Sequence, residues 1–404
     1  AEAFSEQEIR SLSGRIALGH VRYATQGRRN KLDVARDAQP FLFNHTKNGA
    51  IAIAHNGDIR VAPELRKRYL DAGDFFQGTS DTEVILHNFA RAENGSLDGL
   101  LTQTLEPIKE GAYSLVMIVD GKLVGARDVN GFRPLVLGKK GNGYMLASET
   151  VALKRARASY IKEVSPGEIV IIEDTGPRFI QPFGVRSEVG QRKCIFEYAY
   201  FARPDGFLFD ASVSEVIRNF GKKLAEKFGT LGANIMGAVP DSGNDAALGY
   251  ARASGVPLEF IFSRDHFAGR TFIDPDAEKR AAKVRAKLSH YEGLEGKIVT
   301  LVDDSLVRST TSRELVRMLK EDAGVKEVNI LIAFWEFAYR CKYGIDTAKN
   351  KELASHSKRV EEIREFIGAD FLGFLDKEEV LAAVNEVSGL EGFCTACHDG
   401  EYPV

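Results

Sequence analysis

The sequence has 404 residues, of which 44% are hydrophobic and 27% charged, a globular composition with room for about two domains. The 54 Lys and Arg residues against 57 Asp and Glu give a formal net charge of -3, which argues against a nucleic-acid partner because such surfaces are basic. No apolar run is long enough to span a bilayer, and the first residues lack a targeting pattern. We therefore expect a cytoplasmic protein with neither nucleic acid nor membrane as a partner.

The first half of the chain predicts many short strands and two helices. Ser80–Glu83 has the capping-box pattern, so a helix is expected to start there. Asp120-Gly121 is a strong two-residue hairpin signal between two apolar runs. Consecutive hairpins favour antiparallel sheets covered by helices. The expected strands are Ala50–Ala54, Leu115–Val119, Leu123–Ala126, Tyr144–Ala147 and Glu168–Ile172.

Polar clusters stand at the ends of these elements in four places. They contain Arg22 within Gly19–Thr25, Asn56 and Gly57 within His55–Asp58, Asp81 within Ser80–Glu83, and the segment Arg127–Leu135. Taken singly, each has a structural explanation. Asn and Gly suit tight turns, an Asp can be a helix-end charge, and Arg–Asp pairs are usually solvated.

Together and in this order, the clusters resemble the glutaminase domain of the N-terminal-nucleophile (Ntn) amidotransferases. The resemblance implies an Ntn-hydrolase-like αββα domain in which Arg22 grips the α-carboxylate of glutamine and Asp81 binds its α-amino group. It also implies that Asn56 and Gly57 form the oxyanion hole. The matching segments are Gly19–Gly27, His55–Ile59, Ser80–Glu83, Gly111–Leu115, Arg127–Leu135, Ala147–Thr150 and Pro166–Glu168.

The sequence departs from that family at its start. The family nucleophile is an N-terminal cysteine, and here no cysteine precedes Cys194, so no thiolate is available to attack a glutamine amide. The chain as written is therefore not expected to hydrolyse glutamine. Missing strands would also leave a sheet edge uncovered, so a truncated sequence explains the departure better than an evolved loss.

The second half alternates helix and strand, as a parallel sheet requires. Two polar loops follow strands, Pro240–Gly243 and Asp303–Ser312, and the second leads into a helix with Thr311 as the expected N-cap and Glu314 at the capping-box position. A helix N-terminus after a polar loop suits phosphate, and paired aspartates suit Mg²⁺ or sugar hydroxyls. An ordinary turn with acidic residues is the alternative. The expected elements are Val213–Phe228 and Ala246–Ala253 as helices, and Ile235–Val239, Leu258–Phe262, Ile298–Val302 and Val328–Phe334 as strands.

The second loop resembles the signature loop of the type I phosphoribosyltransferases, which bind 5-phosphoribosyl-1-pyrophosphate (PRPP). It is most similar to the loop of the amidophosphoribosyltransferase family. The segment Cys194–Asp205 also resembles the junction segment of that family. The resemblance implies Mg²⁺ at Ser242, Asp303 and Asp304. The residues it implies for PRPP binding are Ser242, Arg270, Lys287, Asp303, Asp304, Ser305, Arg308, Ser309, Thr310, Thr311 and Ser312.

Two departures lie close to this implied site. The family has Lys-Asn-Arg-Tyr where this chain has Ser263–His266, just before a loop that closes over PRPP in the family. The family also has Gly where this chain has Ser309, and a serine forced to φ > 0 costs about 1–2 kcal/mol. We expect weakened but retained PRPP binding, which Ser309→Gly should tighten.

The chain contains four cysteines, too few for a disulfide scaffold. They are Cys194, Cys341, Cys394 and Cys397. Their spacing alone suits zinc or buried thiols. The family resemblance instead implies a [4Fe–4S] cluster with a structural role, because all four fall on the cluster ligands of one class of amidophosphoribosyltransferases. Arg340, Lys342 and His398 replace apolar family residues, so a more exposed cluster is expected.

The sequence therefore predicts an α+β glutaminase domain at residues 1–186 and an α/β phosphoribosyltransferase domain with a parallel sheet and a cluster-binding C-terminal segment at residues 187–404. The implied reaction is the first step of purine synthesis, from PRPP and glutamine or ammonia to 5-phosphoribosylamine. Purine nucleotide inhibitors and a homo-oligomer, dimer or tetramer, are implied as well. The alternatives are a sugar-phosphate amidotransferase, which the loop and the cysteines argue against, and a non-catalytic PRPP- or nucleotide-binding regulatory homologue.

Overall fold

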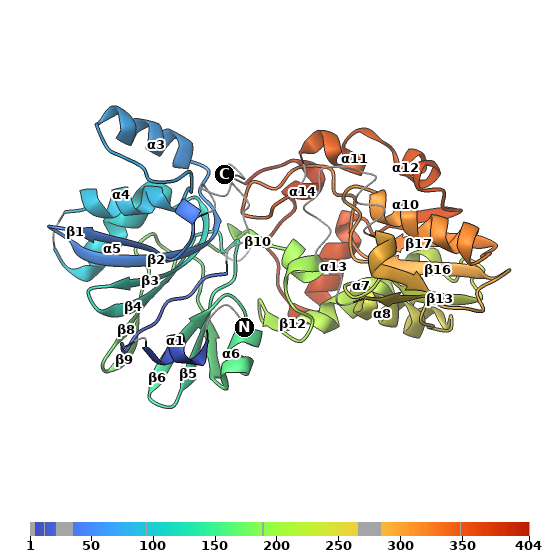
Figure 1. The fold of residues 1–404 in the computed structure, drawn as a ribbon, viewed down its shortest axis with the longest axis horizontal. Helices are drawn as coiled ribbons and strands as arrows, with labels where there is room; N and C mark the ends of the chain where they lie inside the picture. The colour runs from blue at the N-terminus through green and yellow to red at the C-terminus, as the bar shows by residue number, and fades with distance from the viewer. Residues whose placement is uncertain are drawn as a thin grey trace.

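The structure is a computed structural model that describes residues 5–11, 13–21, 35–93, 95–187, 190–265, 284–347 and 349–403. Two layered bodies lie side by side, the first half of the chain in blue and green and the second half in yellow to red (Figure 1). None of the helices in the described ranges is long and apolar enough to cross a membrane.

The first half contains two antiparallel sheets. Six strands pair in the order β1-β2-β3-β4-β8-β9, and three more pair in the order β6-β5-β7. The strands of the larger sheet are β1 (Phe41–His45), β2 (Gly49–Asp58), β3 (Ala112–Val119), β4 (Lys122–Arg127), β8 (Ile169–Glu173) and β9 (Gly176–Ile180). Those of the smaller sheet are β5 (Val136–Lys140), β6 (Gly143–Ala147) and β7 (Ser159–Glu163). The helical elements are α1 (Glu6–Ser11), α3 (Ala62–Asp71), α4 (Glu83–Arg91), α5 (Leu97–Leu105), the 3₁₀ turn η1 (Glu106–Ile108) and α6 (Thr150–Ala156).

Alternation of side chains along the strands sets the layers of this half. Leu115 and Met117 of β3 face a buried core shared with α3, α4 and α5, whereas Val116 between them packs with the smaller sheet. Helix α6 covers the outer side of the smaller sheet, where a Cβ added to Gly138 of β5 would lie 2.8 Å from Leu153 of α6. The layers are helix, sheet, sheet and helix, so the predicted αββα arrangement is confirmed.

Local predictions in this half had mixed outcomes. The Asp120-Gly121 hairpin is confirmed, because both residues have positive φ and Val119 pairs with Lys122. Strand β2 continues beyond Ala54 to Asp58, so the His-Asn-Gly segment lies in a strand and not in a turn. The capping box at Ser80 is wrong: α4 begins at Glu83, whose carboxylate accepts backbone N–H bonds from residues 77 and 78 instead.

The second half is built on a parallel sheet in the order β13-β16-β17-β18. Helices α7 and α8 cover one face with α13 beside α7, and α10 and α12 lie on the other face (Figure 1). The sheet strands are β13 (Ile235–Ala238), β16 (Ile298–Asp303), β17 (Glu327–Ile332) and β18 (Phe371–Phe374). The helices are α7 (Val213–Phe228), α8 (Asn244–Ser254), α10 (Thr310–Arg317), α11 (Ala354–Ser357), α12 (Val360–Ile367), α13 (Lys377–Ser388) and α14 (Ala396–Asp399), with π-helical turns η3 (Glu197–Phe201) and η4 (Met318–Asp322) and a 3₁₀ turn η5 (Asn350–Glu352).

The predicted strand Leu258–Phe262 is wrong. Leu258 makes a single bridge to Met236, and Leu258 and Phe260 are exposed, so regular pairing with β13 does not continue along the segment. A short strand, β14 (Phe262–Arg264), starts only at its end and pairs with β15 (Leu288–His290). The two remaining small sheets pair β11 (Phe207–Leu208) with β12 (Ala211–Ser212) and β10 (Lys193–Cys194) with β19 (Phe393–Cys394).

A buried ion pair joins the two halves. Arg133 follows β4, Glu197 opens η3, and their side chains lie 3.0 Å apart with about 5% exposure each. A second link runs from the N–H of Phe209 to the carboxylate of Glu163, which also pairs with Arg127 at 2.6 Å. Charges removed from water in this way hold position only when paired, so these contacts fix how the halves meet.

Candidate functional site

The loop after β16 places two buried carboxylates at the carboxyl end of the parallel sheet. Asp303 ends the strand and Asp304 follows it, with 8% and 6% exposure. Burial and the neighbouring Asp304 raise the pKa of Asp303 well above its usual range. Burial also raises the pKa of Asp304 to about 6, although hydrogen bonds from Ser242 and Ser305 lower it. The two buried carboxyl groups therefore hold protons more readily than exposed ones.

The Pro240–Gly243 turn lies directly beside these aspartates. Strand β13 pairs in parallel with β16, Ala238 opposite Val302, and the hydroxyl of Ser242 hydrogen-bonds the Asp304 carboxylate. A Cβ at Gly243 would lie 2.5 Å from the carbonyl oxygen of Val302, so only glycine allows this approach. The structure thus brings together Ser242, Asp303 and Asp304, the three residues expected to hold Mg²⁺.

Helix α10 begins one residue before the expected N-cap. Its N-cap is Ser309, in the left-handed region with φ 60° and ψ -7°, and the helix starts at Thr310. The predicted cap at Thr311 with Glu314 is wrong, because Glu314 is buried and ion-paired with Arg285. No side chain of the described residues caps this helix start, so within that part of the chain its first N–H groups are available to an anion.

Other predicted PRPP residues surround this helix start. Ser309 and Ser312 are buried, Thr310 and Thr311 are partly exposed, and Arg308 pairs with Glu352 at 3.2 Å. The Ser309 hydroxyl is buried with no hydrogen-bond partner among the described residues.

The segment expected to close over the site is described only at its base. The carbonyl of Lys287 accepts the N–H of Asp265 at 2.7 Å, and Arg264 pairs with Asp241 of the Pro240–Gly243 turn at 2.5 Å. The altered Ser263–His266 stretch therefore contacts the candidate site through Arg264. The prediction for Arg270 lies outside the described residues.

The second candidate site lies at the end of β2. Asn56 and Gly57 are partly exposed there, and the Asp81 carboxylate accepts the N–H of Ile59 at 2.9 Å. His55, which the sequence reading did not single out, is buried with its Nδ1 atom 3.8 Å from Asp81, and burial lowers its pKa. The structure brings Asn56, Gly57 and Asp81 together, whereas Arg22 lies outside the described residues.

Two further polar residues support this second site and gave no sequence signal. Asp37 accepts the N–H groups of Thr79 and Ser80, at 2.7 and 3.0 Å. Gln39 accepts the N–H of His55 at 2.7 Å. Both come from a segment without a motif, so only the tertiary structure reveals them.

The four cysteines gather between the halves of the chain. Cys194 lies opposite Cys394 in the β10–β19 pair, and Cys341 and Cys394 pack in one small apolar cluster. Burial raises the pKa of all four thiols, and each is close enough to at least one other cysteine for their charges to interact. The Cys341 sulfur accepts the N–H of Tyr343 at 3.3 Å.

Two of the polar substitutions around these cysteines lie against aromatic rings. The Lys342 ammonium lies 3.5 Å from the centre of the Tyr402 ring, and His398 lies against Trp335. Among the residues that the structure describes, no group of three or more His, Cys, Asp or Glu converges to hold a single metal ion.

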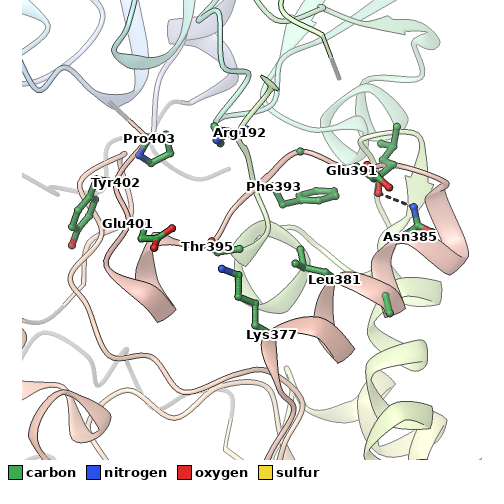
Figure 2. Close-up of a pocket in the computed structure, with 13 residues that line it drawn as sticks. Arg192, Lys377, Leu381, Asn385, Glu391, Phe393, Thr395, Glu401, Tyr402 and Pro403 are labelled. Carbon is green, nitrogen blue, oxygen red and sulfur yellow. Dashed lines mark hydrogen bonds between the residues drawn. The ribbon is translucent and has the colours of Figure 1, made fainter. Parts of the chain in front are cut away.

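A cavity of about 750 Å³ lies beside the cysteines, between α13 and the C-terminal segment. Leu381 of α13 and Phe393 of β19 line it together with Lys377, Glu401 and Tyr402 (Figure 2). None of the residues predicted to bind PRPP, glutamine or a metal lines this cavity.

Comparison with known proteins gives concordant matches. Residues 6–170 match the family model of the glutamine amidotransferase domain. The amidophosphoribosyltransferase of Bacillus subtilis (strain 168) is 41% identical over 405 residues, covering 100% of this chain and 83% of that protein. The chloroplastic amidophosphoribosyltransferase of Vigna aconitifolia is 43% identical, covering 100% and 81%. That of Archaeoglobus fulgidus is 39% identical, covering 100% and 86%.

Two solved structures have the same fold. Glutamine PRPP amidotransferase from B. subtilis, complexed with ADP and GMP, superposes with a TM-score of 0.84 at 40% identity over 95% of this chain and 82% of that chain. A structure described as the allosteric regulatory enzyme of purine biosynthesis gives a TM-score of 0.85 at 40% identity, over 95% and 81%.

Proposed function

Because the chain belongs to the amidophosphoribosyltransferase family, the enzymes of the first step of purine biosynthesis, we propose that its two candidate sites divide that reaction between them. The site at Asp303–Ser312 binds PRPP and transfers its phosphoribosyl group. The site at Asn56, Gly57 and Asp81 binds glutamine. The observation that carries the proposal is the meeting of Ser242, Asp303 and Asp304 at the uncapped start of α10.

At the PRPP site, ammonia forms a bond to C1 of the ribose while the bond from C1 to the pyrophosphate oxygen breaks. The new amine loses a proton, and the products are 5-phosphoribosylamine and pyrophosphate. The N–H groups and hydroxyls of Thr310, Thr311 and Ser312 bind a phosphate of PRPP, with Ser305, Arg308 and Lys287 around it. Charge on the departing pyrophosphate needs this electrostatic support.

The buried oxygen atoms at this site fit Mg²⁺. Asp303, Asp304 and Ser242 offer hard oxygen donors, and a bound cation would offset the burial that raises the pKa of both aspartates. These three residues would hold the ion, which would neutralise pyrophosphate charge when bound.

At the glutamine site, Asp81 binds the α-amino group, and Asn56 and Gly57 donate to the carbonyl oxygen of the amide. Arg22 is assigned to the α-carboxylate on the family pattern. Ammonia released at this site would pass internally to PRPP. The 404 residues contain no cysteine before Cys194, so the tests below supply ammonium directly.

The four cysteines fit a [4Fe–4S] cluster in a structural role. N–H groups of Tyr343 and Ile345 bond the Cys341 sulfur and that of Ala396 bonds Cys394, which stabilises sulfur as thiolate. The family resemblance favours a cluster over zinc, and in a cubane each cysteine binds its own iron. Measured iron, zinc and acid-labile sulfide per chain decide between them.

Regulation, assembly and location remain proposals. The B. subtilis structure holds ADP and GMP, which supports purine nucleotides as inhibitors of this chain. A homo-oligomer follows from family resemblance alone. The cytoplasmic location is an expectation, and several plant relatives are described as chloroplastic.

The test is pyrophosphate release from PRPP by this chain with Mg²⁺ and ammonium. We expect release that depends on ammonium and falls at least about a hundredfold in Asp304→Asn, and is unchanged in the control Asp98→Asn, a half-exposed residue of α5 paired with Arg178. PRPP binding without turnover would instead establish the regulatory homologue.

A further inference from the structure

The backbone of Gly344 lies directly against the backbone of Gly57. A Cβ added to Gly344 would be 2.7 Å from the Cα of Gly57, 2.8 Å from its carbonyl carbon and 3.1 Å from its carbonyl oxygen. Gly344 is buried and has φ +99°, a conformation that other residues rarely adopt. The second half of the chain thus contacts the candidate oxyanion hole through a glycine.

Gly57 is enclosed on its other side as well. A Cβ at Gly57 would overlap the carbonyl oxygen of Ala112, at 1.9 Å, and would lie 2.8 Å from Nε2 of His55. Strand β3 and the Gly344 loop therefore both lie against the backbone of Gly57. An oxyanion hole needs its donors fixed before the reaction, so a contact that confines the Gly57 backbone bears on its function.

The loop that carries Gly344 is itself anchored on both halves. The N–H of Cys341 donates to Thr347 Oγ1 at 2.9 Å, which closes the loop. Tyr343, 2% exposed, stacks on Phe132 with ring centres 4.2 Å apart, and the Phe132 carbonyl accepts the N–H of Cys194 at 3.0 Å.

These contacts make the loop rigid where it meets Gly57. Ala112, Phe132, Tyr343 and Ala396 form one small buried cluster, with Cys341 and Cys394 packed against it. The cluster joins the strand that pairs with Gly57 to the segment of the cysteines. Movement of the cysteine site would be transmitted to the oxyanion hole through a few buried contacts.

We propose that Gly344 is a positioning residue for the oxyanion hole, and that the loop from Cys341 to Thr347 holds the Gly57 peptide in place. The inference rests on the proposed glutamine site. It assigns the cysteine-bearing segment of the second half a part in glutamine chemistry in addition to its structural role.

The test compares Gly344→Ala with Gly73→Ala. Gly73 has a similar φ of +92° but nothing within 4 Å of an added Cβ, so the control imposes the same backbone cost without the contact. Two quantities are measured on the full chain: deuterium uptake of the peptide containing residues 55–59, and calorimetric affinity for glutamine. Ammonium-dependent pyrophosphate release reports on the other site.

We expect Gly344→Ala to raise deuterium uptake at residues 55–59 and to weaken glutamine binding about tenfold, with pyrophosphate release retained. Gly73→Ala should change neither quantity. Unchanged uptake and affinity in Gly344→Ala would overturn the proposal, and so would an equal rise in uptake over both halves, because that would show a general loss of structure.

A second variant covers the case in which Gly344→Ala does not fold. Tyr343→Leu removes the ring stack on Phe132 without adding atoms near Gly57, and should raise uptake in the same peptide. Unchanged uptake there would also contradict the proposal. If the unaltered chain binds no glutamine, the proposed glutamine site fails, whereas the uptake comparison still decides whether Gly344 positions Gly57.

Discussion

Replacing Ser309 with glycine should stabilise the protein. Ser309 has φ 60°, and its buried hydroxyl lacks a partner among the described residues. The backbone costs about 1–2 kcal/mol and the unpaired hydroxyl about 1 kcal/mol or more. Glycine gives back about 0.5–1 kcal/mol through the entropy of the unfolded chain. The net gain is about 2 kcal/mol.

Thermal and urea denaturation of Ser309→Gly measure this gain. For a unit of about 200 residues, 2 kcal/mol corresponds to a rise in Tm of about 4–8 °C. Arg157→Gly is the control, because Arg157 has φ 56° but an exposed side chain, so it recovers only the backbone part. A Tm for Ser309→Gly that is equal to or below that of the unaltered chain would refute the reasoning.

The same variant refines the expectation for PRPP. Because Ser309 has its left-handed conformation in the folded protein, we expect the larger effect in folding and the smaller one in affinity. Calorimetry with PRPP and Mg²⁺ should show binding that is tightened, by less than about tenfold. A large gain in affinity without a gain in stability would mean that Ser309 takes up its left-handed conformation only when PRPP binds.

Three other predictions concern pH, packing and charge. The folded pKa values of Asp303 and Asp304 lie above the unfolded value, so the contribution of these two carboxyl groups to stability falls as pH rises from about 4 through 6. The Mg²⁺-dependent affinity for PRPP should rise with pH over that window. Equal PRPP affinities at pH 5.5 and 8 would contradict this prediction. Gly243→Ala should lower the free energy of unfolding by about 1–3 kcal/mol, against little change in Gly95→Ala, whose added Cβ meets nothing within 4 Å. Glu197→Leu should destabilise the folded protein by about 3–5 kcal/mol, because it leaves Arg133 buried and unpaired. Adding Arg133→Met should recover part of that loss, as measured by urea denaturation. A double variant less stable than the single one would count against a paired role.

Much of the fold was predictable because its signals are local. Val213–Phe228 matches α7 at both ends, since an amphipathic repeat specifies a helix without knowledge of its partners. Strand β16 was expected from a continuous apolar run, which suits a strand buried on both faces. Leu258–Phe262 has the same apolar character but bridges β13 only at Leu258, and the extent of such pairing depends on tertiary structure.

The residues of the candidate sites were predictable from the sequence to a similar extent as the fold. Asp304 and Asn56 were singled out because they stand in segments that resemble known families, and the structure places them directly after β16 and near the end of β2. The N-cap of α10 was misplaced by propensity, because Glu314 is drawn away by Arg285, a residue distant in sequence. Asp37 hydrogen-bonds another segment and stands in no motif, so no local pattern identifies it. His55 lies in a matched segment, but its burial beside Asp81, like the contact of Gly344 with Gly57, depends on tertiary structure.

The most direct test of the central claim follows PRPP by ³¹P NMR with this chain, Mg²⁺ and ¹⁵N-labelled ammonium. The account predicts conversion of PRPP to pyrophosphate and a phosphoribosylamine that carries ¹⁵N on C1, with no conversion when ammonium is omitted. PRPP that stays intact in the presence of folded, PRPP-bound protein would contradict it and leave this chain as a binding protein.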